Sequence, residues 1–135
     1  MRAEDSADGS VETMEAAGMK YVCLVYLDEH GAQALPDGDC VDYDASIRES
    51  GHCLASEALQ PVETATTLKV RNDRLILTDG PFAETREQLA GFYLIEARDL
   101  NEAIRIASGI PPARVGCIEL RPVRPIREAV AAARG

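Results

Sequence analysis

The sequence predicts an α+β fold, a ferredoxin-like sandwich with an inserted β-hairpin. One observation is an apolar, β-prone run at residues 21–27, matched by a second such run at 91–97. Another is a helix over residues 99–109, opened by a capping box and closed by a glycine. The third is a pair of β-prone runs that flank Asn72-Asp73, two residues that tolerate the left-handed angles of a tight hairpin loop.

Composition and charge indicate one acidic globular domain. The chain has 135 residues, of which 46% are hydrophobic and 27% charged, and its formal net charge is -9. This negative net charge disfavours nucleic acid as a partner, because contacts with the negatively charged phosphates dominate the affinity of proteins for nucleic acid. No apolar run approaches the roughly 18 residues of a membrane span, and residues 1–18 lack the apolar core of a signal peptide. We therefore expect a cytoplasmic protein that binds no membrane.

The chain divides into a leader, a domain and a tail. Residues 1–18 hold five acids against one base, so we expect a disordered leader. The domain is expected over residues 19–123, followed by a flexible C-terminal tail at 124–135. Residues 111–135 carry five bases against two acids, which fits either a solvated end or contact with an acidic partner.

The first predicted strand, residues 21–27, is apolar on both of its faces. A strand with one face in water would alternate with polar residues, so each face needs a cover. We expect the chain's own helices on one face and a partner molecule or a pocket on the other. The strand at 91–97 shows the same pattern.

The connecting elements follow from turn and helix signals. Residues 28–38 hold two glycines and a proline and are predicted to form a loop. A narrow apolar stripe over residues 40–51 predicts a short helix, and residues 52–59 predict a strand. The last strand is expected at 115–120, and residues 129–133 are compatible with a further helical turn.

A short polar segment between two apolar runs carries the most specific motif. It reads Asp-Gly-Pro-Phe at residues 79–82, where glycine permits unusual backbone angles and proline fixes its own φ. With Ile-Glu-Leu-Arg-Pro-Val at 118–123, it resembles the DGPF branch of the YCII-related proteins over residues 19–123. The resemblance implies a dimeric α/β barrel, a homodimer through the sheet face with a small-molecule site in the cleft beside each sheet. It also implies genes that often lie beside sigma-factor genes.

Carboxylates and histidines are the candidate catalytic groups. Asp79 comes first, because a turn between strands holds a carboxylate at the rim of a cleft; the alternative is a turn cap that accepts backbone N–H groups. Glu57 and Glu84 are candidate second carboxylates, against the alternative that both are solvated. His52 is the candidate histidine, against the alternative of a surface position, whereas His30 is expected to be exposed.

The candidate binding residues surround the same turn and the two apolar strands. The set is Gly80, Pro81, Phe82, Glu84, Tyr26 and Tyr93. The ring of Phe82 is expected either to fill apolar space beside Gly91 or to line an open cleft.

The sequence departs from the pattern of the wider YCII-related family at two places. The resemblance implies a histidine near the start of the first helix, paired with an aspartate after the second. Here Cys40 and Ile-Pro-Pro at 110–112 stand at those places. Cys40 as a nucleophile is an alternative, but no base is evident beside it. No His, Cys or Asp spacing fits a zinc site and no phosphate loop is evident, so we expect neither a metal nor a cofactor.

Two functions stay open on the sequence alone. The first is a small-molecule enzyme that works by proton transfer, or as a lyase or isomerase. The second is a non-catalytic ligand-binding or regulatory module linked to sigma-factor signalling. The geometry around Asp79 distinguishes them: a second titratable group within hydrogen-bond reach inside a pocket favours the enzyme, and a carboxylate satisfied by backbone amides favours the module.

Overall fold

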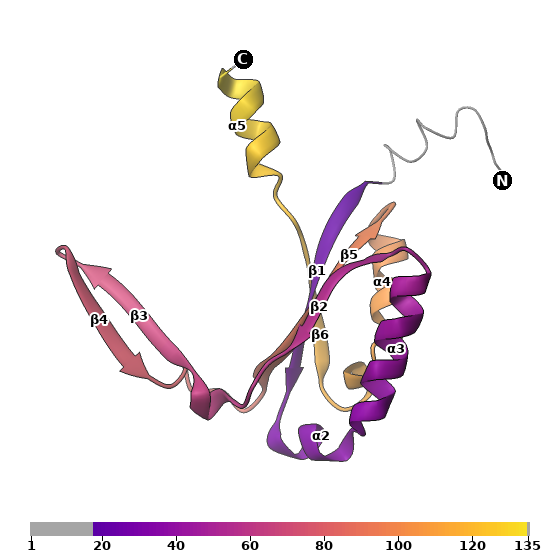
Figure 1. Ribbon diagram of the computed structural model, residues 1–135, viewed down its shortest axis with the longest axis horizontal. Coiled ribbons are helices and arrows are strands. Elements are labelled where there is room, and N and C mark those ends of the chain that lie inside the picture. The colour runs from indigo at the N-terminus through magenta and orange to yellow at the C-terminus, as the bar shows by residue number, and fades with distance from the viewer. Residues whose placement is uncertain (1–17, 135) are drawn as a thin grey trace.

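A four-stranded antiparallel sheet with helices on one face forms the body of the molecule. The computed structural model describes residues 18–134 (Figure 1). The sheet has the order β2-β5-β1-β6, and β3 and β4 form a separate two-stranded sheet. The strands are β1 (Met19–Leu27), β2 (Cys53–Ala58), β3 (Thr66–Arg71), β4 (Arg74–Asp79), β5 (Gln88–Ala97) and β6 (Cys117–Pro122). This mixed α+β arrangement is compatible with the predicted ferredoxin-like fold.

Three helices and two short 3-10 turns connect the described strands, and a fourth helix follows the last strand. The helices are α2 (Glu29–Ala34), α3 (Asp37–Glu49), α4 (Leu100–Ala107) and α5 (Ile126–Arg134), and the 3-10 turns are η1 (Val62–Thr64) and η2 (Pro111–Arg114). Figure 1 shows α3 and α4 together on one face of the sheet. Across residues 18–134, no helix is long and apolar enough to cross a membrane.

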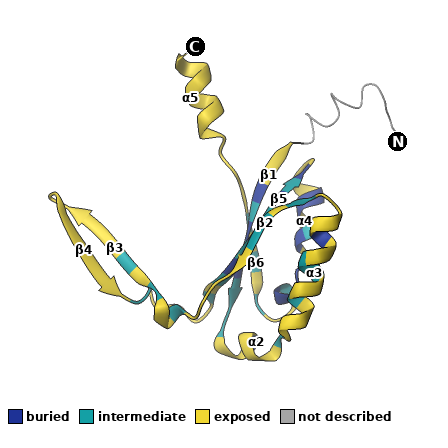
Figure 2. Ribbon diagram, in the orientation of Figure 1, coloured by how far each residue is buried: buried dark blue, intermediate teal, exposed yellow. Residues whose placement is uncertain are grey.

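The core lies between α3, α4 and the inner face of the two central strands. β1 and β5 pair so that Tyr21 lies opposite Ile95 and Cys23 opposite Tyr93. Side chains at alternate positions of both strands point to this face and are buried (Figure 2). The buried apolar residues are Tyr21, Cys23, Val25, Ile47, Tyr93, Ile95, Ala97, Ala103, Ala107 and Ile110. The prediction that the chain's own helices cover one face is confirmed.

The opposite face of the sheet is also apolar but carries no described helix (Figure 1). Its centre consists of Val22 opposite Leu94 and Leu24 opposite Phe92, all four half-buried by their neighbours in the sheet. Both faces of the sheet are therefore apolar, as the sequence pattern indicated. No part of residues 18–134 of the same chain covers the second face.

The capping box predicted for α4 is confirmed. Asp99 is the N-cap, and its Oδ1 accepts a hydrogen bond from the backbone N–H of Glu102 over 2.9 Å. Glu102 returns the interaction, since its Oε1 accepts from the N–H of Arg98 over 2.7 Å. Burial alone would raise the pKa of Glu102, but the hydrogen bonds and charge of Arg98 outweigh it and lower that pKa.

The prediction of a loop over residues 28–38 is wrong. Asp28 caps α2, because its Oδ1 accepts from the N–H of Gly31 over 2.7 Å. Pro36 then precedes α3, which begins at Asp37, earlier than the apolar stripe indicated. Acids in the first turn of α3 suit the positive end of the helix dipole, so their low helix propensity does not prevent its formation.

The predicted hairpin is confirmed as β3 and β4. Thr66 pairs with Asp79 and Arg71 with Arg74. The two turn residues have positive φ, 53° at Asn72 and 62° at Asp73, as a two-residue hairpin loop requires.

The C-terminal tail, expected to be flexible with a helical turn allowed at residues 129–133, contains the helix α5. α5 spans nine residues and buries none of them, so it packs on no other described part of the chain. The predicted leader, residues 1–18, lies outside the described residues except for Gly18.

Candidate functional site

A cleft lies between α3, the end of β2 and the start of β5. Its volume is about 420 Å³, within the roughly 300–1,000 Å³ that is typical of small-molecule sites. Apolar side chains form most of its wall, including Val25, Leu27, Leu35, Val41 and Tyr93. Its polar side chains are Asp37, Cys40, Asp44, Ser56 and Glu57. Three of these are carboxylates and no residue of the lining is basic.

One wall of the cleft depends on Gly91 of β5. A Cβ added there would lie 2.8 Å from the carbonyl oxygen of Glu57 on β2. The strands pair at this point, with Ala58 opposite Gly91. The missing side chain therefore lets β2 and β5 approach each other beside the cleft.

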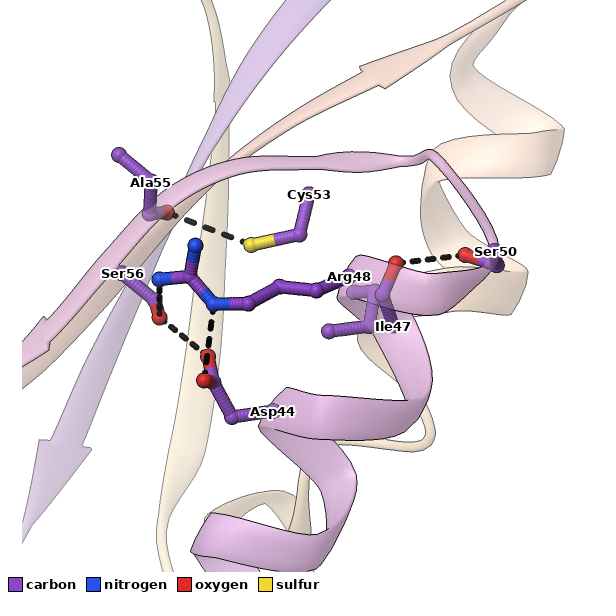
Figure 3. A network of polar contacts seen from close by, with 7 residues as sticks. All are labelled: Asp44, Ile47, Arg48, Ser50, Cys53, Ala55 and Ser56. Carbon is purple, nitrogen blue, oxygen red and sulfur yellow. Dashed lines mark hydrogen bonds and ion pairs between the residues drawn. The ribbon is translucent and has the colours of Figure 1, made fainter.

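A polar network joins α3 to β2 at the cleft (Figure 3). The hydroxyl of Ser56 donates a hydrogen bond to Oδ1 of Asp44, and Nε of Arg48 donates to Oδ2 over 2.9 Å. Nη2 of Arg48 also donates to Oγ of Ser56 over 3.0 Å, which closes a ring of three side chains. Asp44 and Arg48 come from one helix face because residues four apart lie one above the other.

Three groups at the cleft have shifted pKa values, and each shift moves the pKa further from pH 7. The hydrogen bond from Ser56, helped by Arg48, lowers the pKa of Asp44 despite its partial burial. Burial, followed by nearby carboxylates, raises the pKa of Cys40. Burial also raises the pKa of Tyr93. At neutral pH these residues present a carboxylate, a protonated thiol and a neutral phenol.

Tyr43 holds α3 against the core beside the cleft. Its hydroxyl donates to the carbonyl oxygen of Ile106 on α4 over 2.5 Å. Its ring meets Tyr93 edge to face, with ring centroids 5.9 Å apart. Burial raises the pKa of Tyr43 to about 12, so the hydroxyl keeps its proton at physiological pH. These contacts fix α3, and with it Asp44, relative to β5.

The comparison with known families covers most of the chain. Residues 19–127 match the YCII-related domain. The chain belongs to the YCII-related family. Uncharacterized protein R00369 of Rhizobium meliloti (strain 1021) is 36% identical to it over 114 residues, which cover 78% of this chain and 92% of that protein.

Two residues predicted for the site of this YCII-related protein do line the cleft. Glu57 lies exposed near the end of β2, and Tyr93 is buried on β5. Tyr26 lies instead on the uncovered face of the sheet, where it is half-buried. The structure therefore brings together one predicted carboxylate and one of the two predicted tyrosines.

The two histidines lie outside the cleft lining. Nδ1 of His52 is 2.9 Å from the carbonyl oxygen of Glu96, so its N–H links the turn before β2 to β5. His30 is exposed in the first turn of α2, beside a second cavity of about 730 Å³. Asp28 and Arg86, whose carboxylate and guanidinium lie 3.7 Å apart, line this second cavity too. No cluster of three or more metal-ligating side chains occurs in the described part of the chain.

The Asp-Gly-Pro-Phe turn lies at the base of the hairpin, and none of residues 79–84 lines the cleft. Gly80 has a φ of 98°, so the prediction that this turn requires glycine is confirmed. Its N–H donates to the carbonyl of Ala65 over 2.7 Å, and its carbonyl accepts from the hydroxyl of Thr67 over 2.8 Å. Asp79 is exposed at the end of β4.

Phe82 is 87% exposed. The expectation that its ring fills apolar space beside Gly91 is therefore wrong, and it does not line the cleft either. The segment between β4 and β5 consists of bends and irregular backbone, with no helix or strand of its own to hold the ring against the core. Glu84 in the same segment is exposed as well, while Pro81 is half-buried.

Sequence reasoning missed Asp44, Arg48 and Ser56. The available signal was the spacing of four between an acid and a base on a predicted helix, which indicates a pair on one face. The pairing with Ser56 depends on how α3 lies over β2, and no local pattern carries that information.

Proposed function

We propose that this YCII-related protein binds a small molecule with a cationic head and an apolar body in the cleft between α3, β2 and β5. The observation that carries the proposal is the cleft lining, which combines apolar walls with three carboxylates and no basic side chain. Hydrogen bonds between an ionised carboxylate and a charged amine are among the strong polar contacts of proteins. The charge of Asp44 is already paired with Arg48 over 2.9 Å, so a ligand amine would meet the exposed carboxylates of Asp37 and Glu57.

The shifted pKa values favour binding over catalysis. A general acid or base works best when its pKa lies near the working pH, whereas Asp44 is lowered and Cys40 and Tyr93 are raised. The second candidate function is an enzyme of the proton-transfer, lyase or isomerase type. It is favoured by Glu57, an exposed carboxylate within the lining that a ligand would contact.

The family supports the choice of this cleft. Cys40 stands where the resemblance implies a histidine, and Pro112 belongs to the segment where it implies an aspartate. Both residues line the same cavity although they lie far apart in the sequence. The Asp-Gly-Pro-Phe motif supports a place in the DGPF branch, and the regulatory role beside sigma factors would then use the cleft as a sensor.

A ligand screen with matched probes tests the binding proposal. Thermal unfolding is measured with phenethylamine and hexylamine, and with the carboxylates 3-phenylpropanoate and hexanoate. The amines are expected to raise the melting temperature, and Glu57→Gln is expected to reduce that shift. Glu49→Gln, which removes an exposed carboxylate at the end of α3, is the matched control. Equal stabilisation by the carboxylates, or an unchanged amine shift in Glu57→Gln, would contradict the proposal.

The uncovered face of the sheet supports a homodimer. Val22, Leu24, Phe92 and Leu94 form an apolar surface at the centre of that face, and burial of apolar area contributes on the order of 25 cal/mol per Å². Sedimentation at micromolar concentration is expected to show twice the chain mass of 14.6 kDa. Leu24→Lys should give monomers, whereas Leu100→Lys on the exposed side of α4 should not. A monomeric wild type would refute the dimer.

A further inference from the structure

The β3–β4 hairpin, here termed the arm, stands clear of the body. It comprises residues 66–79. Figure 1 shows it projecting on the side of the sheet away from α3 and α4, and Figure 2 shows it exposed over most of its length.

The arm has one apolar and one basic face. Its register places Leu68 opposite Leu77 and Val70 opposite Leu75, and directly paired residues share a face. These four side chains are 57–62% exposed. The alternate positions form the other face, which consists of Thr67, Lys69, Arg71, Arg74, Ile76 and Thr78.

The strict alternation of apolar and polar residues indicates that another surface packs on the apolar face. A two-stranded hairpin is at best marginally stable alone in water and needs a further strand, a helix or another packing surface. The tight turn at Asn72 and Asp73 fixes the register, so the four aliphatic side chains are held in one array. Within residues 18–134 nothing covers them, as their exposure shows.

Charge favours a second copy of this chain as the cover. The arm carries three basic and two acidic side chains, whereas the rest of residues 18–134 carries 10 basic and 16 acidic ones. The basic side chains lie on the face opposite the aliphatic ones, so they attract the acidic body of a second copy at long range and stay outside the apolar contact itself. The same charge balance disfavours a second arm as the docking surface.

The position of the arm agrees with this choice. The arm leaves the body on the side of the uncovered sheet face (Figure 1), so a copy packed on Leu24 and Phe92 lies where the arm projects. In a two-fold dimer each chain would then present its arm to the other.

We infer that the arm clasps a second copy of this chain, with Leu68, Val70, Leu75 and Leu77 packed on the body of that copy. The inference rests on the proposed homodimer and adds a second contact surface to it. It is independent of any ligand in the cleft.

The dimer dissociation constant, measured by sedimentation, tests the arm. Leu68→Thr combined with Leu77→Thr keeps β-prone residues but removes half of the apolar face. It is expected to weaken the dimer at least about tenfold. Ile76→Thr, on the basic face of the same strand, is the matched control and should change the constant less than about threefold. An unchanged constant in the double variant would overturn the inference, whereas a monomeric wild type would refute the homodimer itself.

A fluorescence measurement tests the arm independently, in case the double variant fails to fold. The chain contains no tryptophan, so Leu75→Trp places a unique probe on the apolar face of the arm. Its emission should be blue-shifted at dimer concentrations and move to that of exposed tryptophan on dilution. Exposed emission in the dimer would overturn the inference. So would a blue shift that persists in the monomer, since the arm would then fold onto its own chain.

Discussion

Ser56 on β2 donates a hydrogen bond from its hydroxyl to Oδ1 of Asp44 on α3, and Arg48 bonds to both residues. β2 is an edge strand whose ladder runs to β5 alone. The network therefore fastens this edge strand to the helix through the side chain of Ser56. It sets the position of two walls of the cleft relative to each other.

The first prediction concerns Ser56→Ala. Loss of the hydroxyl removes one hydrogen bond to an ionised carboxylate and one from a guanidinium, so the free energy of unfolding should fall by about 1–2 kcal/mol. Urea titration measures the change. Ser46→Ala, at an exposed position of α3, is the control and should change stability by less than about 0.5 kcal/mol. Equal effects of both substitutions would show that the network contributes nothing.

The second prediction concerns pH. The pKa of Asp44 is lowered in the folded state, chiefly by the hydrogen bond from Ser56, so the folded state binds a proton there less readily than the unfolded chain. The contribution of Asp44 to stability is therefore fully present above the ordinary aspartate pKa, about 3.9. It is lost as the pH falls through the lowered value.

Urea titrations of the wild type and Asp44→Asn from pH 7 to pH 3 test this. The wild type should be the more stable protein at pH 7, and the difference should shrink at the acid end. Asp42→Asn removes an exposed carboxylate from the same helix and controls for the loss of charge. A difference that grows towards low pH would contradict the sign of the shift.

The third prediction concerns Gly91→Ala. Alanine is normally favoured over glycine within a strand, but here its Cβ would lie 2.8 Å from the carbonyl oxygen of Glu57. Relief of that clash must move β2 away from β5, so we expect a loss of about 1–3 kcal/mol in urea titration. Gly38→Ala in the first turn of α3, with nothing within 4 Å, is the control and should be neutral or stabilising. A variant Gly91→Ala as stable as the wild type would show that β2 adapts freely.

Most of the fold could be predicted from local patterns in the sequence. The apolar runs at residues 21–27 and 91–97, the capping box at Asp99 and the positive-φ pair at Asn72 and Asp73 depend on neighbours in the chain, and each proved correct. The loop prediction at residues 28–38 is wrong because the glycines and the proline there do not prevent helix formation. The side chain of Asp28 instead supplies a helix cap.

The site was less predictable because its residues meet only through packing. Glu57 and Tyr93 were named, but Asp44 and Ser56 come together only once α3 lies over β2. Phe82 illustrates the opposite error. Its apolar character indicated burial, yet its ring is 87% exposed, in a segment that has no helix or strand of its own.

The last prediction concerns Asp79. Its carboxylate is exposed, and the hydrogen bonds that shape the turn are made by the backbone of Gly80 and the hydroxyl of Thr67. Asp79→Asn and Asp79→Ala should therefore both unfold within about 0.5 kcal/mol of the wild type. Both should also bind amines in the cleft as the wild type does, because Asp79 does not line it.

The two substitutions separate the remaining roles of Asp79. A loss of about 1 kcal/mol in Asp79→Ala that Asp79→Asn restores would establish a turn cap, since the amide keeps an oxygen acceptor. Loss of turnover in both variants at unchanged stability would establish a general base, because an amide takes no proton. Gly80→Ala is the control for the turn itself. At a φ of 98° a side chain is strained, so this variant should lose more than about 1 kcal/mol where the variants of Asp79 do not.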